Sequence, residues 1–496
     1  MIRHCILCWQ AVALLFLLST PVFAAPEIDA TLTENLTELL ADRALKNARV
    51  GLEVRNVESG EAIFAHHADV ALVPASTMKV VTAAAALNNL GPSYTFSTVV
   101  HSGGVIDSAG RLKGNLYVQG HGDPTMVVEK LWKLVYDLKL AGLQRVEGDV
   151  IFDEGFLTTD YVLPGWNKEK DIENGPSYFP ALSALSLNFN TVAIIVAPGS
   201  EVGKPARVQL ETPAGTYVTL NNEVTTGSYG SRRALEIKRN VGESTISYTV
   251  TGSMPTGAKM RKYYRAVADP TAHFMAAWEE MEKLHGIVVT GRHRRGATPN
   301  DARQLLALQS PPLASILMDM NKYSNNYMAE LVLRTLGAET HGLPGDTAKG
   351  IQAVNTYLMG LGIDETEFNL INGSGLTRQA TIRPSHLNEV LLGMSADPRT
   401  GNEFRASLAI AGQDGTLVNR LTGQPGTLRG KTGTIDGVHC LTGYVEDASG
   451  DLYAFSFMVN DIRGSVSQVR RVHDRFARVM LAAGQPGLAV VEGGPE

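Results

Sequence analysis

Cysteine is scarce in this chain, with three residues among 496, namely Cys5, Cys8 and Cys440. Cys5 and Cys8 precede the apolar run Ala11–Leu18, in a segment that we expect to be removed. Only Cys440 would then remain. A single cysteine excludes an internal disulfide and a cysteine-based metal site.

A basic tract is also missing. The chain has 44 Lys and Arg against 50 Asp and Glu, a formal net charge of −6, which makes nucleic-acid binding through counterion release a poor hypothesis. No apolar stretch after the first 24 residues is long enough to cross a bilayer. With 44% hydrophobic and 19% charged residues, the chain is too apolar to be disordered, and its length favours two or three packed domains.

The N-terminus has the layout of a secretory signal peptide. Arg3 precedes the short apolar run Ala11–Leu18, and Val22-Phe23-Ala24 places small residues at the cleavage positions. The run is shorter than the roughly 20 residues that a membrane-spanning helix needs. We therefore predict that residues 1–24 are a cleaved signal and that the exported protein has no transmembrane anchor.

Hydrophobic periodicity divides the remaining chain into three regions that differ in their predicted secondary structure. An amphipathic helix around Leu32–Leu40, a hairpin over 50–64 and an Ala-rich helix from Ser76 come first. Short alternating strands and glycine-rich turns then dominate residues 95–265, which predicts a β-rich insert. Afterwards we expect helices over 313–320, 327–336 and 466–481, and strands over 428–434, 441–445 and 452–459.

Catalytic chemistry is indicated first by the segment Pro74–Lys79, which holds a Ser-x-x-Lys pattern. On a helix, Ser76 and Lys79 share a face one turn apart, so the hydroxyl and the amine can touch. A serine hydroxyl needs an adjacent base, and a buried lysine with a lowered pKa can be that base. Alone the pattern is weak, since it recurs by chance in chains of this size.

Two further segments strengthen the hypothesis. Ser324-Asn325-Asn326 occupies a short loop between two predicted helices, where a hydroxyl and an amide can face a cleft. Lys431–Thr434 lies on a predicted strand, where Gly433 lets a peptide-like substrate approach the backbone, and Lys431 and Thr432 offer a charge and a hydroxyl to a carboxylate. An ordinary helix cap and a solvated edge strand are the alternatives for each segment alone.

The ordered set Ser-x-x-Lys, Ser-x-Asn and Lys-Thr-Gly resembles the active site of penicillin-binding proteins and serine β-lactamases. More closely, the chain resembles the D-alanyl-D-alanine carboxypeptidase/endopeptidase family of class C, low-molecular-mass penicillin-binding proteins (peptidase S13). The long gap between Lys79 and Ser324 is typical of that family, which inserts extra domains there. Further segments carry the resemblance: Gly120–Thr125, Ser183–Asn190, Val267–Pro270, Asn372–Arg378 and Gly412–Leu417.

This resemblance implies a serine D,D-peptidase of peptidoglycan stem peptides that β-lactam antibiotics acylate and inhibit, located in the periplasm and using no cofactor or metal. It leaves open the cleavage of D-Ala–diaminopimelate cross-links and a peripheral membrane location. By the same resemblance Ser76 attacks, Lys79 is the base, and Ser324 passes a proton to the leaving amine. The resemblance also implies that Asn326 binds the substrate amide and forms a hydrogen bond to Lys79, and that Lys431 provides a positive potential. Thr432 would bind the terminal carboxylate, and the backbone N–H groups of Ser76 and Thr434 would form an oxyanion hole. Arg378 would contact the stem peptide.

We expect an α/β (α+β) fold in which an antiparallel sheet is flanked by helices, as in serine β-lactamases and transpeptidases, with β-rich inserted domains. The catalytic domain is expected over 25–92 and 267–487, one inserted domain over 93–163 and 259–266, and a second over 164–258. Two other functions remain open, a β-lactamase or related serine esterase and a non-catalytic cell-wall-binding protein. A metal site at His66-His67 is rejected, because neighbouring strand residues point to opposite faces.

Overall fold

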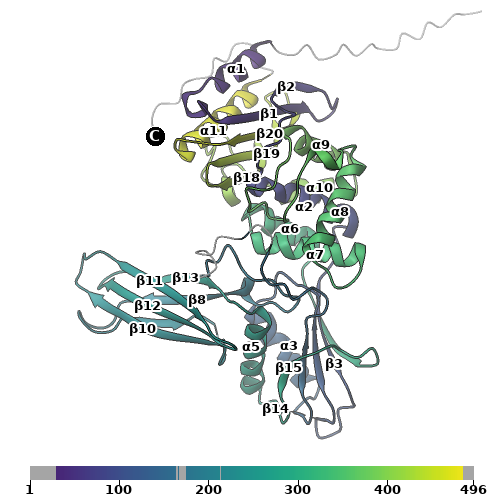
Figure 1. Cartoon of the computed structure of the whole chain (residues 1–496), viewed down its shortest axis with the longest axis vertical. Helices are drawn as coiled ribbons and strands as arrows, with labels where there is room; N and C mark the ends of the chain where they lie inside the picture. Colours follow the sequence, from purple (N-terminus) through teal and green to yellow (C-terminus); the bar gives the residue numbers. More distant parts are fainter. Residues whose placement is uncertain (1–29, 164–165, 167–174, 213, 484–496) are drawn as a thin grey trace, which may run out of the picture.

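The computed structural model describes residues 30–163, 166, 175–212 and 214–483 (Figure 1). The predicted signal peptide, residues 1–24, lies outside these ranges. Within them, no helix combines the length and the apolar character needed to cross a membrane.

The first two and the last four strands of the described residues form a six-stranded sheet in which each neighbouring pair is antiparallel, in the order β17-β18-β19-β20-β1-β2. The hairpin predicted near the N-terminus and the three strands predicted near the C-terminus therefore belong to one sheet. Their bounds are β1 Arg49–Asn56, β2 Ala62–His66, β17 Ala409–Ile410, β18 Leu428–Ile435, β19 Val438–Glu446 and β20 Leu452–Asn460.

Helices cover both faces of this sheet. Successive residues of a strand point to opposite faces, and in the central strands the two sets enter two different cores. In β20, Ala454 and Met458 belong to one core, while Phe455 and Phe457 belong to the other. The first core holds most of the helices, and the second holds α1 and α11. The expected fold class is confirmed. The helices are α1 Ala30–Leu40, α2 Met78–Leu90, α6 Leu313–Lys322, α7 Asn326–His341, α8 Thr347–Gly360, α9 Pro384–Ala396, α10 Gly401–Ser407 and α11 Val466–Ala482.

Between α2 and α6 the chain forms two further lobes, which Figure 1 shows below the six-stranded sheet and diverging from each other. The first lobe has a five-stranded sheet, β15-β7-β5-β3-β16, and a small sheet, β14-β6-β4, packed with helices α3 and α5 around a separate core. Its elements are β3 Ser97–Ser102, β4 Arg111–Leu112, β5 Leu116–Gly120, α3 Val128–Leu140, β6 Arg145–Val146, β7 Val150–Asp153, α5 Pro270–His285, β14 Val288–Val289, β15 His293–Arg295 and β16 Arg303–Gln309.

The second lobe is a pair of three-stranded sheets, β10-β12-β11 and β13-β8-β9, that share their own apolar core. It contains the segments predicted as strands near 192–196 and 246–250. Its strands are β8 Thr191–Ala197, β9 Arg207–Leu210, β10 Val218–Gly227, β11 Ala234–Val241, β12 Ile246–Pro255 and β13 Arg261–Ala266.

Two expected domain boundaries differ from the contacts in the structure. We expected the catalytic domain to resume at residue 267, but Phe274 and Trp278 of α5 are buried in the core of the first lobe, and β16 pairs with β3. We expected 259–266 in the first lobe, but β13 pairs with β8 of the second. Periodicity predicts that a helix or strand has a buried face, but not which core buries it. We propose that the catalytic domain resumes at α6.

Candidate active site

The nucleophile candidate lies at the start of the central helix. Ser76 is the middle residue of a single 3-10 turn, Ala75–Thr77, that leads directly into α2, and Lys79 is in the first turn of α2. The amine Nζ of Lys79 donates to Ser76 Oγ at 3.0 Å. The contact inferred from their spacing is therefore present, although a 3-10 turn rather than the α-helix itself carries the serine.

The amine of Lys79 is surrounded by acceptors in a fully buried position. Besides Ser76 Oγ, it donates to Asn326 Oδ1 at 2.8 Å and to the carbonyl of Ser374 at 2.8 Å. Burial disfavours the charged form and lowers the pKa of Lys79 to about 7, against the opposing attraction of the Glu330 carboxylate. A substantial fraction of this amine is therefore unprotonated near neutral pH and able to accept a proton from Ser76.

A second hydroxyl–lysine pair lies across the site. Ser324, in the turn between α6 and α7, has a left-handed backbone with φ of 55°, and its Oγ accepts a 2.9 Å hydrogen bond from Lys431 Nζ. Lys431, on β18, is fully buried, so desolvation lowers its pKa well below the usual value, and the nearby charge of Lys79 lowers it further. The structure thus links the predicted loop to the predicted strand.

Strand β18 lies directly against the turn that carries Ser76. A Cβ atom at Gly433 would lie 2.6 Å from the carbonyl oxygen of Pro74, closer than real Cβ atoms come to a backbone atom, and 3.0 Å from the backbone nitrogen of Ser76. Glycine at this position allows the close approach. The neighbouring hydroxyl of Thr432 donates to Thr416 Oγ1 at 2.9 Å, and exposed Thr434 contacts His439 Nδ1 at 2.8 Å through its own hydroxyl.

The three sequence segments therefore converge. Ser76, Lys79 and Asn326 are joined by hydrogen bonds, as are Ser324 and Lys431, and Gly433 brings β18 against Ser76. Arg378 is not hydrogen-bonded to any of them. Its exposed guanidinium donates to the carbonyl of Asp436, in the turn after β18, and so lies at the end of this strand.

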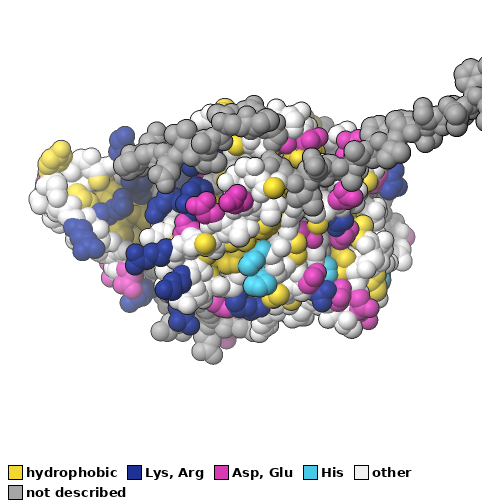
Figure 2. All heavy atoms as spheres, turned by 90° about the horizontal axis from the view of Figure 1, so that it is seen from above, with side chains coloured by type: hydrophobic (Ala, Val, Ile, Leu, Met, Phe, Trp, Pro, Cys, Tyr) yellow, Lys and Arg dark blue, Asp and Glu magenta, His cyan; other side chains and the backbone are white. Residues whose placement is uncertain are grey.

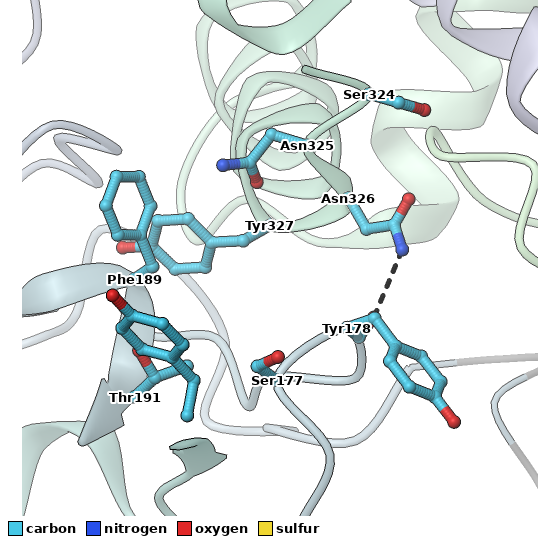
Figure 3. A pocket seen from close by; sticks show the side chains of 9 residues that line it. Ser177, Tyr178, Phe189, Thr191, Ser324, Asn325, Asn326 and Tyr327 are labelled. Carbon is cyan, nitrogen blue, oxygen red and sulfur yellow. Dashed lines mark hydrogen bonds between the residues drawn. The ribbon is translucent and has the colours of Figure 1, made fainter. Parts of the chain in front are cut away.

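A pocket of about 270 Å³ adjoins the site between the start of α7 and the inserted lobes (Figure 3). One wall includes Ser324 and Asn326, and the amide of Asn326 spans the gap by donating Nδ2 to the carbonyl of Tyr178 at 3.1 Å. The inserts thus form part of the wall beside the candidate catalytic residues. The pocket is lined by Ser177, Tyr178, Phe189, Thr191, Tyr264, Ser324, Asn325, Asn326 and Tyr327.

Reasoning from the sequence missed one buried carboxylate at this site. Glu330 is one helical turn after Asn326 on α7, fully buried, and its two oxygens accept backbone N–H bonds from Gly373 at 3.0 Å and Ser374 at 2.8 Å. Burial raises its pKa, and these hydrogen bonds oppose the rise. The four-residue spacing from Asn326 was the available signal, but a glutamate on a helix is ordinarily exposed.

The segment 372–378 packs against the turn that carries Ser76. Asn372 Oδ1 accepts from the backbone N–H of Gly375 at 2.9 Å, and a Cβ at Gly375 would lie 1.9 Å from the carbonyl oxygen of Ala75. The glycine allows this turn to pack against the backbone immediately before Ser76.

Comparisons with known proteins agree with this geometry. The profile of the D-Ala-D-Ala carboxypeptidase 3 (S13) family matches residues 32–480. The chain is 34% identical over 449 residues to a D-alanyl-D-alanine carboxypeptidase of Actinomadura sp. (strain R39), covering 87% of this chain and 81% of the relative. It is 27% identical over 455 residues to D-alanyl-D-alanine carboxypeptidase DacB of Haemophilus influenzae, covering 90% and 91% of the two chains.

The Haemophilus influenzae relative is also similar in fold. Penicillin-binding protein 4 (dacB) from Haemophilus influenzae superimposes with a TM-score of 0.77 at 25% identity, covering 90% of this chain and 98% of that one. A structure of the same protein in complex with a β-lactam has a TM-score of 0.73 at 24% identity.

The fold and site thus define a penicillin-binding-protein type of serine hydrolase. The chain belongs to the D-Ala-D-Ala carboxypeptidase 3 (S13) family. The predicted activity, hydrolysis of D-Ala-D-Ala peptides of peptidoglycan by a serine carboxypeptidase, is confirmed at the level of the family.

Proposed function

We propose that the protein cleaves D-Ala-D-Ala stem peptides through an acyl-enzyme on Ser76. The observation that carries this proposal is the 3.0 Å contact between Ser76 Oγ and Lys79 Nζ, at an amine whose pKa is lowered to about 7. Lys79 takes the hydroxyl proton while Oγ attacks the penultimate D-Ala carbonyl. The C–N bond then breaks, the terminal D-Ala leaves as the amine, and the peptide remains as an ester on Ser76.

The leaving amine needs a proton, and the proton that Lys79 took from Ser76 reaches it through the other hydroxyl. In this proposal Ser324 relays it, held by Lys431 Nζ at 2.9 Å, while Asn326 holds both Lys79 and the substrate amide. Thr432 binds the terminal carboxylate in the potential of Lys431. The backbone N–H groups of Ser76 and Thr434 stabilise the oxyanion, which is possible because Gly433 permits β18 to lie against the nucleophile turn.

A water molecule then hydrolyses the ester and restores the free serine. In a β-lactam the amide bond is part of a ring, so its amine stays attached after the attack and hinders water, and we infer that β-lactams acylate Ser76 and inhibit the enzyme. The β-lactam complex of the Haemophilus influenzae protein supports this inference. Endopeptidase cleavage of D-Ala–diaminopimelate cross-links uses the same steps with a larger leaving amine.

We also infer export to the periplasm, where peptidoglycan is located. The signal-peptide layout of residues 1–24 supports this inference, as does the cell-wall chemistry of the family. Stem-peptide contact by Arg378 remains a proposal supported by its position beside the turn after β18.

Labelled penicillin tests the mechanism. Purified protein is expected to carry one covalent adduct, located on Ser76 by mass spectrometry of its peptides, and Ser76→Ala is expected to carry none. Ser59→Ala, an exposed serine in a turn, is the matched control and should be labelled as the wild type. An adduct that survives in Ser76→Ala would exclude the assignment. Steady penicillin turnover much faster than peptide hydrolysis would favour a β-lactamase instead.

A further inference from the structure

The second inserted lobe has an outer end made of three neighbouring loops. These are 198–206, between β8 and β9, 228–233, between β10 and β11, and 256–260, between β12 and β13. Backbone hydrogen bonds join the first and third loops to the end of β10, directly before the second loop: Gly203 N donates to Thr226 O, Thr226 N donates to Lys204 O, and Thr256 N donates to Gly227 O. A Cβ at Gly257 would touch the ring of Tyr229 at 3.0 Å, so the last two loops are in contact. We call these three loops the lobe tip.

Each loop of the lobe tip exposes one large apolar side chain. Val202 is 59% exposed, Tyr229 is 85% exposed and Met260 is 56% exposed. Figure 2 shows hydrophobic side chains at the outer end of this lobe, away from the rest of the molecule. A single exposed apolar residue is ordinary, but one on each of three neighbouring loops gives the lobe tip an apolar character.

Exposed cations lie on the same three loops and at the start of β13. Lys204, Arg232, Arg233, Lys259 and Arg261 are all exposed, and none has a carboxylate within ion-pair distance among the described residues. Glu201 is the one acidic residue in the three loops. Over residues 191–266 the lobe has ten Lys and Arg against five Glu, although the whole chain has a net charge of −6. The positive charge is therefore concentrated on this lobe.

We propose that the lobe tip docks on an anionic phospholipid membrane. Exposed aromatic and aliphatic side chains together with exposed cations are what an interfacial site requires, since the apolar groups enter the headgroup boundary and the cations meet lipid phosphates. An anionic polymer would use the cations alone and would leave Val202, Tyr229 and Met260 without a partner. Docking through the lobe tip would hold the six-stranded sheet away from the bilayer, because the second lobe projects sideways below that sheet in Figure 1.

Vesicle sedimentation of the chain beginning at Ala25 tests this proposal. Binding is expected on phosphatidylglycerol/phosphatidylethanolamine vesicles and not on phosphatidylcholine vesicles. It should weaken as salt is raised from about 0.01 M to about 1 M, because the screening length falls from about 30 Å to about 3 Å. Arg232→Gln with Arg233→Gln is expected to lower the partition coefficient about fivefold for each cation removed. Tyr229→Ser with Met260→Ser is expected to lower it at least about tenfold.

Matched controls lie on the first lobe, where Lys113 and Arg145 are exposed cations and Val105 is 71% exposed. Lys113→Gln with Arg145→Gln, and Val105→Ser, should leave vesicle binding unchanged. All variants should keep wild-type acylation by penicillin, which separates this proposal from the proposed mechanism. Equal binding to both vesicle types would overturn it. So would loss of binding in the arginine variant with full binding in the Tyr229 and Met260 variant, which would indicate an anionic polymer.

Discussion

Glu330 and Ser374 form a link between a buried carboxylate and the proposed catalytic base. Oε1 of Glu330 accepts the backbone N–H of Ser374 at 2.8 Å, and the carbonyl of the same Ser374 accepts from Lys79 Nζ at 2.8 Å. The carboxylate therefore acts on Lys79 twice, by fixing an acceptor for its amine and by electrostatic attraction across the buried site. This arrangement determines how the proposed mechanism should respond to pH.

Acylation of Ser76 is expected to rise with pH and to level off above about pH 7. The reaction needs the neutral form of Lys79, and burial lowers the pKa of Lys79 to about 7. Below that pH the neutral fraction falls about tenfold for each unit. The measurement is the second-order rate of penicillin acylation across the pH range. A rate that falls as pH increases through 7 would contradict a lysine base.

Glu330→Gln is expected to move this pH profile to lower pH. Removing the carboxylate removes an attraction that raises the pKa of Lys79, so the neutral amine persists in more acidic solution. The variant should also lose about 1–3 kcal/mol of stability, because a glutamine cannot accept both N–H bonds, from Gly373 and Ser374, with equal geometry. Glu58→Gln, at an exposed position, should change neither property. If the pH profile of Glu330→Gln is the same as that of the wild type, Glu330 has only a structural role.

Gly433→Ala is expected to lower the acylation rate by about 100-fold or more. Its Cβ would lie 2.6 Å from the carbonyl oxygen of Pro74 and 3.0 Å from the nitrogen of Ser76, so β18 must move away from the nucleophile. Gly423→Ala, where an added Cβ meets nothing within 4 Å, is the control and should acylate normally. The acylation rate is measured by stopped flow and compared with the melting temperature. A slow rate at an unchanged melting temperature indicates a displaced oxyanion hole rather than general unfolding. Near-normal acylation of Gly433→Ala would refute the proposed role of β18.

Thr432→Val is expected to reduce kcat/KM on a D-Ala-D-Ala peptide by about tenfold or more, because a hydrogen bond to the terminal carboxylate is lost. With the same peptide carrying a C-terminal amide, the variant's kcat/KM should fall much less, since that terminus carries no charge. Thr416→Val removes the partner 2.9 Å from the Thr432 hydroxyl and tests whether that contact orients the hydroxyl. Equal losses on the acid and the amide would argue against carboxylate binding by Thr432.

The sequence by itself determined the chemistry and most of the secondary structure. Ser76 and Lys79 are three residues apart, so any helical turn brings them together, and the segments 441–445 and 452–459 were predicted as strands of the sheet. These features depend on residues close in the chain, and local geometry is sufficient to predict them.

Only the tertiary structure decided which distant groups meet. The burial that lowers the pKa of Lys79 comes from several elements packed around it, Glu330 reaches the site through the turn at Ser374, and α5 packs on an insert although we had assigned it to the catalytic domain. The chain pattern shows that a side chain is buried but not what covers it. Partners hundreds of residues apart are set by packing, and that packing exists only in the folded molecule.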